Sequence, residues 1–212
     1  MKYWNKRLQK MTEYIPGEQP DNLNEFIKLN TNENPFPPSS AVLDALQKAC
    51  NGDLRRYPNP NAQMVRELFA KKNSLAADNV FVANGSDEIF TLLFRGFIEP
   101  DGIAAFPYPS YALYYTMAEA NGIAYDKITL DDNFDIPFDE FLKKKYNLVI
   151  IANPNNPTGK GVPIDQIKKF CSKFKGLLVV DEAYVDFYNE TAMPLVKEFD
   201  NIVITRSFSK SY

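Results

Sequence analysis

An alternation of short apolar runs and helical segments constrains the fold of this chain more than any other sequence feature. From residue 79 onward, each apolar or β-branched run is followed by a turn rich in Gly, Pro or Asn and then by an amphipathic segment. The runs are VFVAN (80–84), IAAF (103–106), AYDKITL (124–130), LVIIA (148–152), LLVVD (177–181) and IVITR (202–206). Strands that are apolar on both faces need cover on both faces, and helical crossovers between parallel strands supply it. The sequence therefore predicts an α/β fold, a mostly parallel sheet with helices on both faces.

The periodicity also predicts the helices and the division of the chain. Amphipathic spacing indicates helices at residues 41–50, 62–72, 86–97, 110–121 and 165–175. Residues 1–38 contain many turn formers and little periodicity, which predicts an extended N-terminal arm, and residues 39–212 are expected to form one large domain. The chain ends soon after its last apolar run, where a parallel-sheet protein would normally continue into a helix, so we expect it to be part of a longer chain.

Composition and charge exclude several classes of function. Of the 212 residues, 45% are apolar, which is enough for a hydrophobic core. The 24 Lys and Arg residues and 27 Asp and Glu residues give a net charge of −3, so the chain lacks the positive field that nucleic acids and anionic membranes need. The sequence contains no histidine, which excludes a Ser-His-Asp triad, a Cys–His pair and a His-containing zinc site. We expect no metal, no nucleic acid and no membrane as partners.

Cysteine use and hydropathy suggest a compartment. Cys50 and Cys171 are far apart and form no Cys-x-x-Cys motif, which is typical of reduced thiols. The N-terminus has no apolar core of a secretion signal, and no apolar run approaches the length of about 18 residues that a membrane span requires. A cytoplasmic location is the expectation.

Polar and aromatic residues follow the predicted strands at the points where ligands bind in parallel sheets. Ligands of open α/β sheets lie beyond the carboxyl ends of the strands. The segments at these positions are 84–88, 107–111, 153–159, 181–184 and 207–210. Because the carboxyl ends of parallel strands share one edge of the sheet, we expect these five segments to converge on one site.

Residues Gly85, Ser86 and Asp87 begin a predicted helix. The free backbone N–H groups and the positive dipole end of such a helix form a seat for an anion, most simply a phosphate. The charge of Asp87 opposes a dianion unless its carboxylate turns away to cap the helix. The alternative is a plain turn with an N-cap and no ligand.

An acidic residue and a lysine at two of the strand ends are candidates for catalysis. Asp181 directly follows an apolar strand, and a buried carboxylate needs a cationic partner such as a protonated ring nitrogen. Lys210 is a primary amine among hydroxyls and can act as a nucleophile toward an aldehyde. The alternatives are a helix-capping Asp and a solvated surface Lys.

Three further residues suit an aromatic ligand. Asn156 and Tyr184 offer two hydrogen-bond donors for a phenolate oxygen, and Tyr111 offers a flat ring for stacking. Core packing is the alternative for Tyr111, because three more tyrosines lie beside it: Tyr108, Tyr114 and Tyr115.

Together these residues resemble the fold-type I, pyridoxal-phosphate-dependent aminotransferases of class I/II. Within that group, four segments are similar to the histidinol-phosphate aminotransferases: Tyr14-Ile15-Pro16-Gly17, residues 29–38 (LNTNENPFPP), Arg56-Tyr57-Pro58 and Asn84-Gly85-Ser86-Asp87-Glu88. The resemblance covers essentially the whole chain. It implies pyridoxal 5′-phosphate (PLP) as the cofactor.

The resemblance implies a role for each site residue. Lys210 would hold the cofactor covalently and move a proton at the substrate Cα, and Asp181 would pair with the ring nitrogen. Tyr184 and Asn156 would bind the ring oxygen and Tyr111 would stack on the ring, with Lys210, Asp181 and Tyr184 as the catalytic residues. The phosphate would be held by Gly85, Ser86, Asp87, Ser207 and Ser209. Tyr57 would reach the cofactor phosphate of a neighbouring subunit, which implies a homodimer, and Tyr14 would contact the substrate.

The implied reaction is transamination between an amino donor and a 2-oxo acid. The leading hypothesis is the conversion of histidinol phosphate and 2-oxoglutarate to imidazole-acetol phosphate and glutamate, in histidine biosynthesis. The alternatives are another enzyme of the same fold, such as a threonine-phosphate decarboxylase or an aromatic aminotransferase, and a non-catalytic binding module.

Family members also contain parts that have no counterpart in this sequence. They include an Arg shortly after the position of Lys210, a last antiparallel strand that inserts in the sheet, and most of the small domain. The resemblance therefore implies that these 212 residues alone transfer amino groups weakly or not at all.

Overall fold

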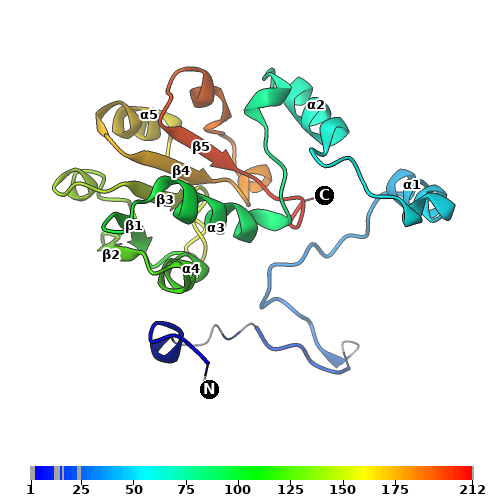
Figure 1. Cartoon of the computed structure of the whole chain (residues 1–212), viewed down its shortest axis with the longest axis horizontal. Coiled ribbons are helices and arrows are strands. Elements are labelled where there is room, and N and C mark those ends of the chain that lie inside the picture. Colours follow the sequence, from blue (N-terminus) through cyan, green and yellow to red (C-terminus); the bar gives the residue numbers. More distant parts are fainter. Residues whose placement is uncertain (1–2, 12–14, 16, 23–24, 212) are drawn as a thin grey trace.

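A parallel sheet forms the centre of the protein. The computed structural model describes residues 3–11, 15, 17–22 and 25–211. Within these residues the sheet has five strands in the order β2-β1-β3-β4-β5, and all neighbouring strands run parallel (Figure 1). The strands are β1 (Ile103–Tyr108), β2 (Ala124–Thr129), β3 (Leu148–Ala152), β4 (Leu177–Asp181) and β5 (Ile202–Thr205). The predicted α/β class is confirmed.

Helices connect the strands and precede the sheet. In the described chain they are α1 (Ser40–Ala49), α2 (Gln63–Lys72), α3 (Gly85–Phe97), α4 (Leu113–Asn121) and α5 (Ile164–Lys173). Short 3₁₀ helices cover Leu8–Lys10, Gly52–Arg55, Ala77–Asn79, Glu140–Leu142, Val185–Phe187 and Met193–Lys197. None of the helices that the structure describes is long and apolar enough to span a bilayer.

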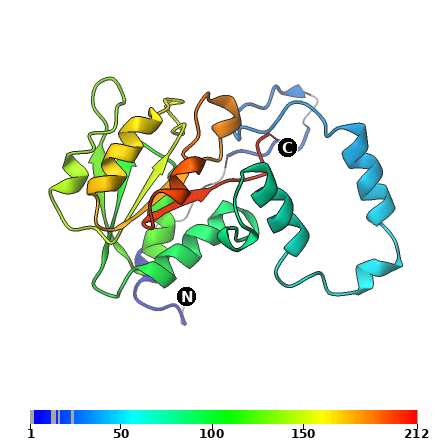
Figure 2. The same cartoon turned by 90° about the horizontal axis from the view of Figure 1, so that it is seen from above.

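The two faces of the sheet bury separate layers of apolar side chains. In the central strand β3, Leu148 and Ile150 pack with α3 and α4, whereas Val149 and Ile151 pack with α5. Figures 1 and 2 show these helices on opposite sides of the sheet. The alternation follows from the two-residue period of a strand. It continues past the end of β4, so that Asp181 contacts the α3–α4 layer and Glu182 contacts the α5 layer.

The predicted strand at residues 80–84 is wrong. The backbone is extended at Val80, with φ −116° and ψ 127°, but no described strand pairs with this segment, and Phe81 is 70% exposed. An apolar run forms a strand only where a neighbour satisfies its backbone hydrogen bonds. The sheet ends at β5, and no described strand lies between β5 and this segment.

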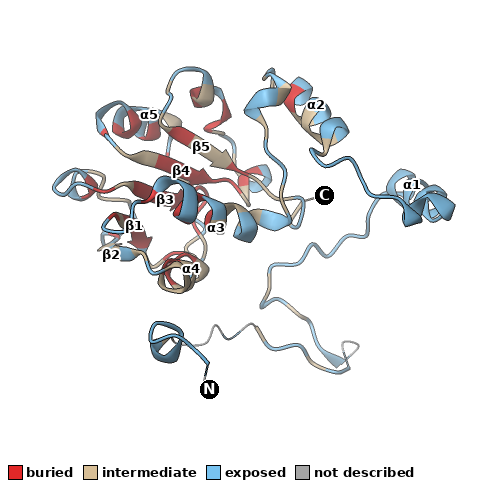
Figure 3. Cartoon of the chain, in the orientation of Figure 1, coloured by how far each residue is buried: buried red, intermediate tan, exposed pale blue. Residues whose placement is uncertain are grey.

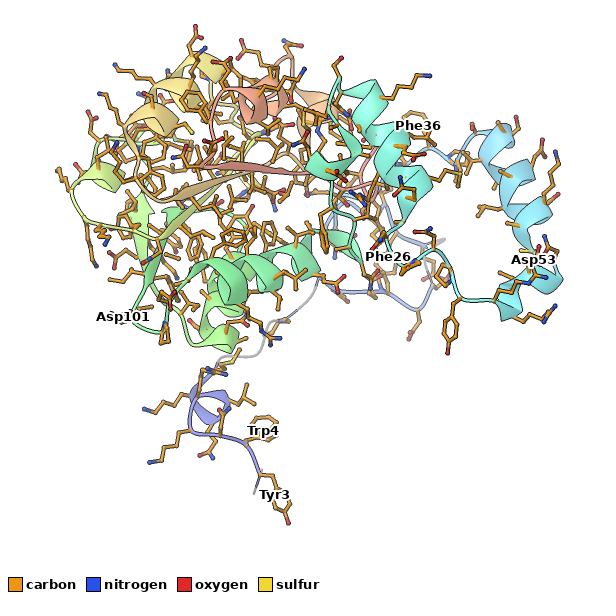
Figure 4. All side chains as sticks on the ribbon, turned by 45° about the horizontal axis from the view of Figure 1, so that its top comes forward. Tyr3, Trp4, Phe26, Phe36, Asp53 and Asp101 are labelled. Atoms are coloured by element: carbon orange, nitrogen blue, oxygen red, sulfur yellow. The ribbon has the colours of Figure 1, made fainter. Side chains whose placement is uncertain are left out.

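Helix α1 forms where the sequence predicted it, but its apolar face is uncovered. Val42, Leu43 and Leu46 are all exposed, and Figures 1 and 3 show the helix apart from the sheet. Phe36, just before α1, is also exposed (Figure 4). Amphipathic spacing therefore predicted the helix correctly without revealing what covers it.

The close approach of β4 to the segment before β3 gives a prediction about stability. A Cβ at Gly176 would lie 2.4 Å from the carbonyl oxygen of Tyr146 and 2.7 Å from that of Asn147. Backbone atoms cannot rotate away, so Gly176→Ala must displace the start of β4. We expect this substitution to lower the free energy of unfolding by about 1–3 kcal/mol, measured by urea denaturation of the full chain.

Gly96→Ala is the matched control. Its Cβ would meet no atom within 4 Å, and Gly96 lies in α3. Alanine there should leave stability unchanged or raise it by up to about 1 kcal/mol. Equal stability of the Gly176→Ala and wild-type proteins would contradict this close packing around Gly176.

Candidate active site

A hollow of about 380 Å³ lies at the carboxyl edge of the sheet and brings most of the predicted site residues together. Its lining includes Gly85, Ser86, Asp87, Tyr111, Asn156, Asp181, Tyr184, Ser207, Ser209 and Lys210. Tyr57 does not line it, because its side chain is fully exposed elsewhere. Tyr14 lies outside the described residues. A larger hollow of about 570 Å³ beside α5 contains none of the predicted residues.

Asp181 is the buried acid of the site. It is the last residue of β4, and only 5% of its surface is exposed. One carboxylate oxygen, Oδ1, accepts hydrogen bonds from Thr205 Oγ1 at 3.0 Å and from the backbone N–H of Ala183 at 3.2 Å. The other, Oδ2, accepts a hydrogen bond from the hydroxyl of Tyr114 at 2.5 Å. No described Lys or Arg forms an ion pair with this carboxylate.

The environment of Asp181 opposes its negative charge. Burial raises the pKa of Asp181 above its ordinary value, and the nearby charge of Asp87 raises it further. The hydrogen bonds from Tyr114, Thr205 and Ala183 lower the pKa and offset part of this effect. A buried carboxylate without a cation favours a positively charged ligand group beside it.

Lys210 lies beneath a segment of the N-terminal arm. Its ammonium Nζ donates to the carbonyl oxygen of Thr31 at 3.2 Å and lies 5.7 Å from the centroid of the Tyr184 ring. Next to Thr31, Asn32 has a left-handed backbone with φ 53° and donates from Nδ2 to the Tyr184 hydroxyl at 3.0 Å. Two neighbouring arm residues thus contact two of the predicted catalytic residues.

The first turn of α3 forms one end of the hollow. Gly85 has φ +78°, a backbone conformation that glycine adopts without strain, and the side chain of Asn84 does not cap the helix. Burial raises the pKa of Asp87, and the charge of Lys210 lowers it. The first backbone N–H groups of a helix have no intrahelical acceptor, so this turn can donate to an anion.

Hydroxyl groups from the loop after β5 face the same hollow. Ser207 and Ser209 both line it, and their side chains are 2.8 Å apart in a hydrogen bond. The backbone N–H of Ser209 also donates to Ser207 Oγ at 3.1 Å. These contacts hold the turn that carries Lys210, and they place small donors near the first turn of α3.

Buried amides hold the loop that carries Asn156. Asn153 is fully buried; it donates to the carbonyl oxygen of Val162 at 3.1 Å and accepts from its N–H at 2.7 Å. Asn155 accepts from the Ser110 hydroxyl at 2.7 Å, which joins this loop to the loop after β1. The position of Asn156 relative to Tyr111 therefore depends on side chains that do not line the hollow.

A buried ion pair joins the ends of β4 and β5 on the opposite face. The Glu182 side chain is fully buried, and its Oε2 accepts hydrogen bonds from Arg206 Nε at 3.0 Å and Nη2 at 2.8 Å. The hydroxyl of Thr191 donates to the same carboxylate at 2.8 Å. Glu182 directly follows Asp181 and Arg206 directly follows β5, so this ion pair joins the two chain segments that leave β4 and β5.

Several residues of this site were not predicted from the sequence. Tyr114 was considered only as core packing, although its position three residues after Tyr111 puts both on one face of the helix predicted at residues 110–121. Glu182 follows Asp181, so the strand period could have placed it on the far face. The contacts of Thr31 and Asn32 span 179 and 152 residues of the chain, and no local pattern signals them.

Comparisons with known proteins identify the family of the chain. The family described as aminotransferase class I and II matches residues 24–212. The chain is 42% identical over 211 residues to a histidinol-phosphate aminotransferase from Clostridium beijerinckii, covering 99% of this chain and 58% of that protein. It is 44% identical over 208 residues to one from Rhodopirellula baltica, covering 97% and 57%. The chain thus spans little more than half the length of these relatives.

Solved structures share the fold. Histidinol-phosphate aminotransferase from Sinorhizobium meliloti, in complex with pyridoxal-5′-phosphate, has a TM-score of 0.86 at 22% identity, covering 100% of this chain and 60% of that one. The histidinol-phosphate aminotransferase from Clostridium acetobutylicum has a TM-score of 0.73 at 25% identity, covering 85% and 55%. Since the family match extends over nearly the whole sequence, the chain belongs to the class I and II aminotransferases.

Proposed function

We propose that this chain forms the cofactor-binding part of an aminotransferase that uses PLP. The observation that carries the proposal is that the Lys210 amine and the buried Asp181 carboxylate line one hollow. An amine can hold an aldehyde, and a buried carboxylate without a cation can hold a protonated ring nitrogen. Few ligands other than PLP carry both groups.

The remaining lining residues fit the other parts of PLP. The first turn of α3, with Ser86, Ser207 and Ser209, suits a phosphate, and the ring of Tyr111 suits a flat heterocycle. Asn156 and Tyr184 lie on the same hollow and suit a phenolate oxygen. Asp87 fits a phosphate less well, because its carboxylate repels an anion.

Each residue then has a task in amino-group transfer. When bound, PLP supplies a ring that accepts electrons from a carbanion at the substrate Cα. Asp181 would keep the ring nitrogen charged, and Tyr184 and Asn156 would fix the ring oxygen. Lys210 would hold the cofactor and, once released, carry the proton at the substrate Cα.

For the substrates we propose histidinol phosphate and the glutamate/2-oxoglutarate pair. Support comes from relatives at 42% and 44% identity that are named histidinol-phosphate aminotransferases. A threonine-phosphate decarboxylase or an aromatic aminotransferase would bind PLP with the same residues. Activity toward different substrates distinguishes these two enzymes from a histidinol-phosphate aminotransferase. A binding module without chemistry has no use for an amine beside a buried acid.

The proposal includes a homodimer and a cytoplasmic enzyme of amino-acid biosynthesis. Tyr57 is fully exposed, which suits a residue that reaches the cofactor phosphate of a second subunit. The uncovered apolar face of α1 suits the same interface. We propose the same division of the chain as before, an arm over residues 1–38 and a large domain over residues 39–212.

Covalent labelling tests the role of Lys210. We expect PLP added to the full chain to give a visible absorption band, and borohydride reduction to fix the cofactor on the protein, seen as a mass increase. Lys210→Ala should abolish the mass increase, and Lys145→Ala, at an exposed lysine, should not. Labelling that survives in Lys210→Ala would show that another amine holds the aldehyde.

The raised pKa of Asp181 predicts opposite effects of Asp181→Asn on stability and on binding. The folded protein binds the Asp181 proton more tightly than the unfolded chain does, so the ionised carboxylate lowers stability at neutral pH. Asp181→Asn should raise the unfolding midpoint of the cofactor-free protein at neutral and alkaline pH, and the gain should shrink as the pH falls through the raised pKa.

The same Asp181→Asn substitution should weaken the binding of PLP. An amide cannot neutralise a ring cation, so the dissociation constant of Asp181→Asn for PLP should rise by about tenfold or more. The control is Asp132→Asn, at an exposed position, which should change neither quantity. A destabilised Asp181→Asn protein that binds PLP as tightly as the wild type would contradict both expectations.

A substrate panel on a protein of the full length of the relatives tests the specificity. With 2-oxoglutarate as acceptor, we expect kcat/KM for histidinol phosphate to exceed that for aromatic amino acids by about 10²-fold. O-Phosphothreonine should give no carbon dioxide. Release of carbon dioxide from O-phosphothreonine at a higher rate than transamination would identify the chain as part of a decarboxylase instead.

A further inference from the structure

Tyr114 is a buried tyrosine whose hydroxyl reaches the floor of the hollow. It is the second residue of α4 and has no exposed surface. Its ring packs edge-on against Phe90 at 5.1 Å and against Tyr111 at 5.5 Å between centroids. These contacts fix the ring in one orientation, and that orientation directs its hydroxyl to Asp181 Oδ2 at 2.5 Å.

The two oxygens of Asp181 have different numbers of hydrogen-bond donors. Oδ1 accepts two hydrogen bonds, from Thr205 and Ala183, whereas Oδ2 accepts one, from Tyr114, among the residues that the structure describes. An ionised carboxylate has about two acceptor sites on each oxygen. Oδ2 therefore retains a site for one further donor, and Tyr114 determines the direction in which that site points.

We propose that Tyr114 is a positioning residue, which acts through Asp181 to orient its carboxylate toward a cationic ring nitrogen and to keep it ionised. The inference rests on the proposed function. Without the hydroxyl, Oδ2 would lose its only described donor in a buried setting, and the proton would move from the ligand's nitrogen toward the carboxylate. Asp87 is the other ionisable group that affects this carboxylate, and it disfavours the charge.

The electrostatics of the site agree with a Tyr114 hydroxyl that favours the ionised form of Asp181. Burial raises the pKa of Asp181, and the Tyr114 hydrogen bond is the largest of the contributions that lower it. Burial raises the pKa of Tyr114 well above its ordinary value, and the charge and the hydrogen bond of Asp181 raise it further, so the tyrosine remains a donor. The hydroxyl keeps its proton while the acid keeps its charge.

Tyr115 provides a built-in comparison. It follows Tyr114 in α4 and is also buried, but its hydroxyl donates to the carbonyl oxygen of Pro107 at 2.8 Å and has no described contact with Asp181. Replacing either tyrosine with phenylalanine removes one buried hydroxyl from the same helix. A difference between the two variants therefore reports on Asp181 rather than on packing.

The test titrates the full chain with PLP and with its 1-deaza analogue, which has carbon in place of the ring nitrogen. Tyr114→Phe should weaken PLP binding by about tenfold relative to the wild type, whereas Tyr115→Phe should change it by less than about twofold. Binding of the deaza analogue should be the same in Tyr114→Phe and the wild type, because that ring carries no charge for Asp181 to stabilise.

Several outcomes would overturn the inference. Equal weakening of PLP and of the deaza analogue in Tyr114→Phe would show a purely structural role, and unchanged PLP binding would show no role. If Tyr114→Phe does not fold, tyrosine labelled with ¹³C at Cζ of position 114 in the wild type serves instead. Its resonance should shift with PLP and not with the deaza analogue, and identical responses would refute the inference. A wild-type protein that binds no PLP would instead refute the proposed function.

Discussion

A carboxylate buried at the end of β4, with three hydrogen-bond donors and no described cation, is the feature on which the rest of the site depends. Burial alone would favour the protonated acid. The donors from Tyr114, Thr205 and Ala183 oppose that effect. The apolar strand thus places the carboxylate where water cannot solvate its charge. Hydrogen bonds from Tyr114 in α4 and Thr205 in β5 offset part of this lost solvation. A ligand cation would offset the remainder.

The parallel sheet explains why the partners of this acid meet. Strands β3, β4 and β5 are neighbours, so the loops that follow them leave the same edge side by side, with Asn156, Asp181 and Lys210 in or directly before these loops. On the other face, the Glu182–Arg206 ion pair joins two of these loops. Thr31 also lines the hollow and accepts a hydrogen bond from Lys210. Residues outside the hollow therefore determine the geometry inside it.

Local patterns in the sequence were sufficient for the class of fold and for most of the lining of the hollow. The two-residue period of a strand and the residue types that follow each strand can be read from a short stretch of sequence. Asp181 and Lys210 were therefore predicted to line the site. Three features depend on distant parts of the structure and were missed or wrong. Residues 80–84 pair with none of the strands that the structure describes, Tyr114 was considered only as core packing, and the contact between Asn32 and Tyr184 spans 152 residues. Strand formation and side-chain partners require neighbours that periodicity does not specify.

The central claim is that Asp181 is a buried acid that becomes fully ionised when a ring cation binds beside it. The most direct measurement is the ¹³C resonance of the Asp181 carboxyl carbon, assigned with Asp181→Asn and followed against pH. Without cofactor, the account predicts titration above the ordinary pKa of Asp. With PLP bound, it predicts an ionised carboxylate throughout the pH range in which the protein is folded. Titration at the ordinary value of Asp in both states would contradict the account.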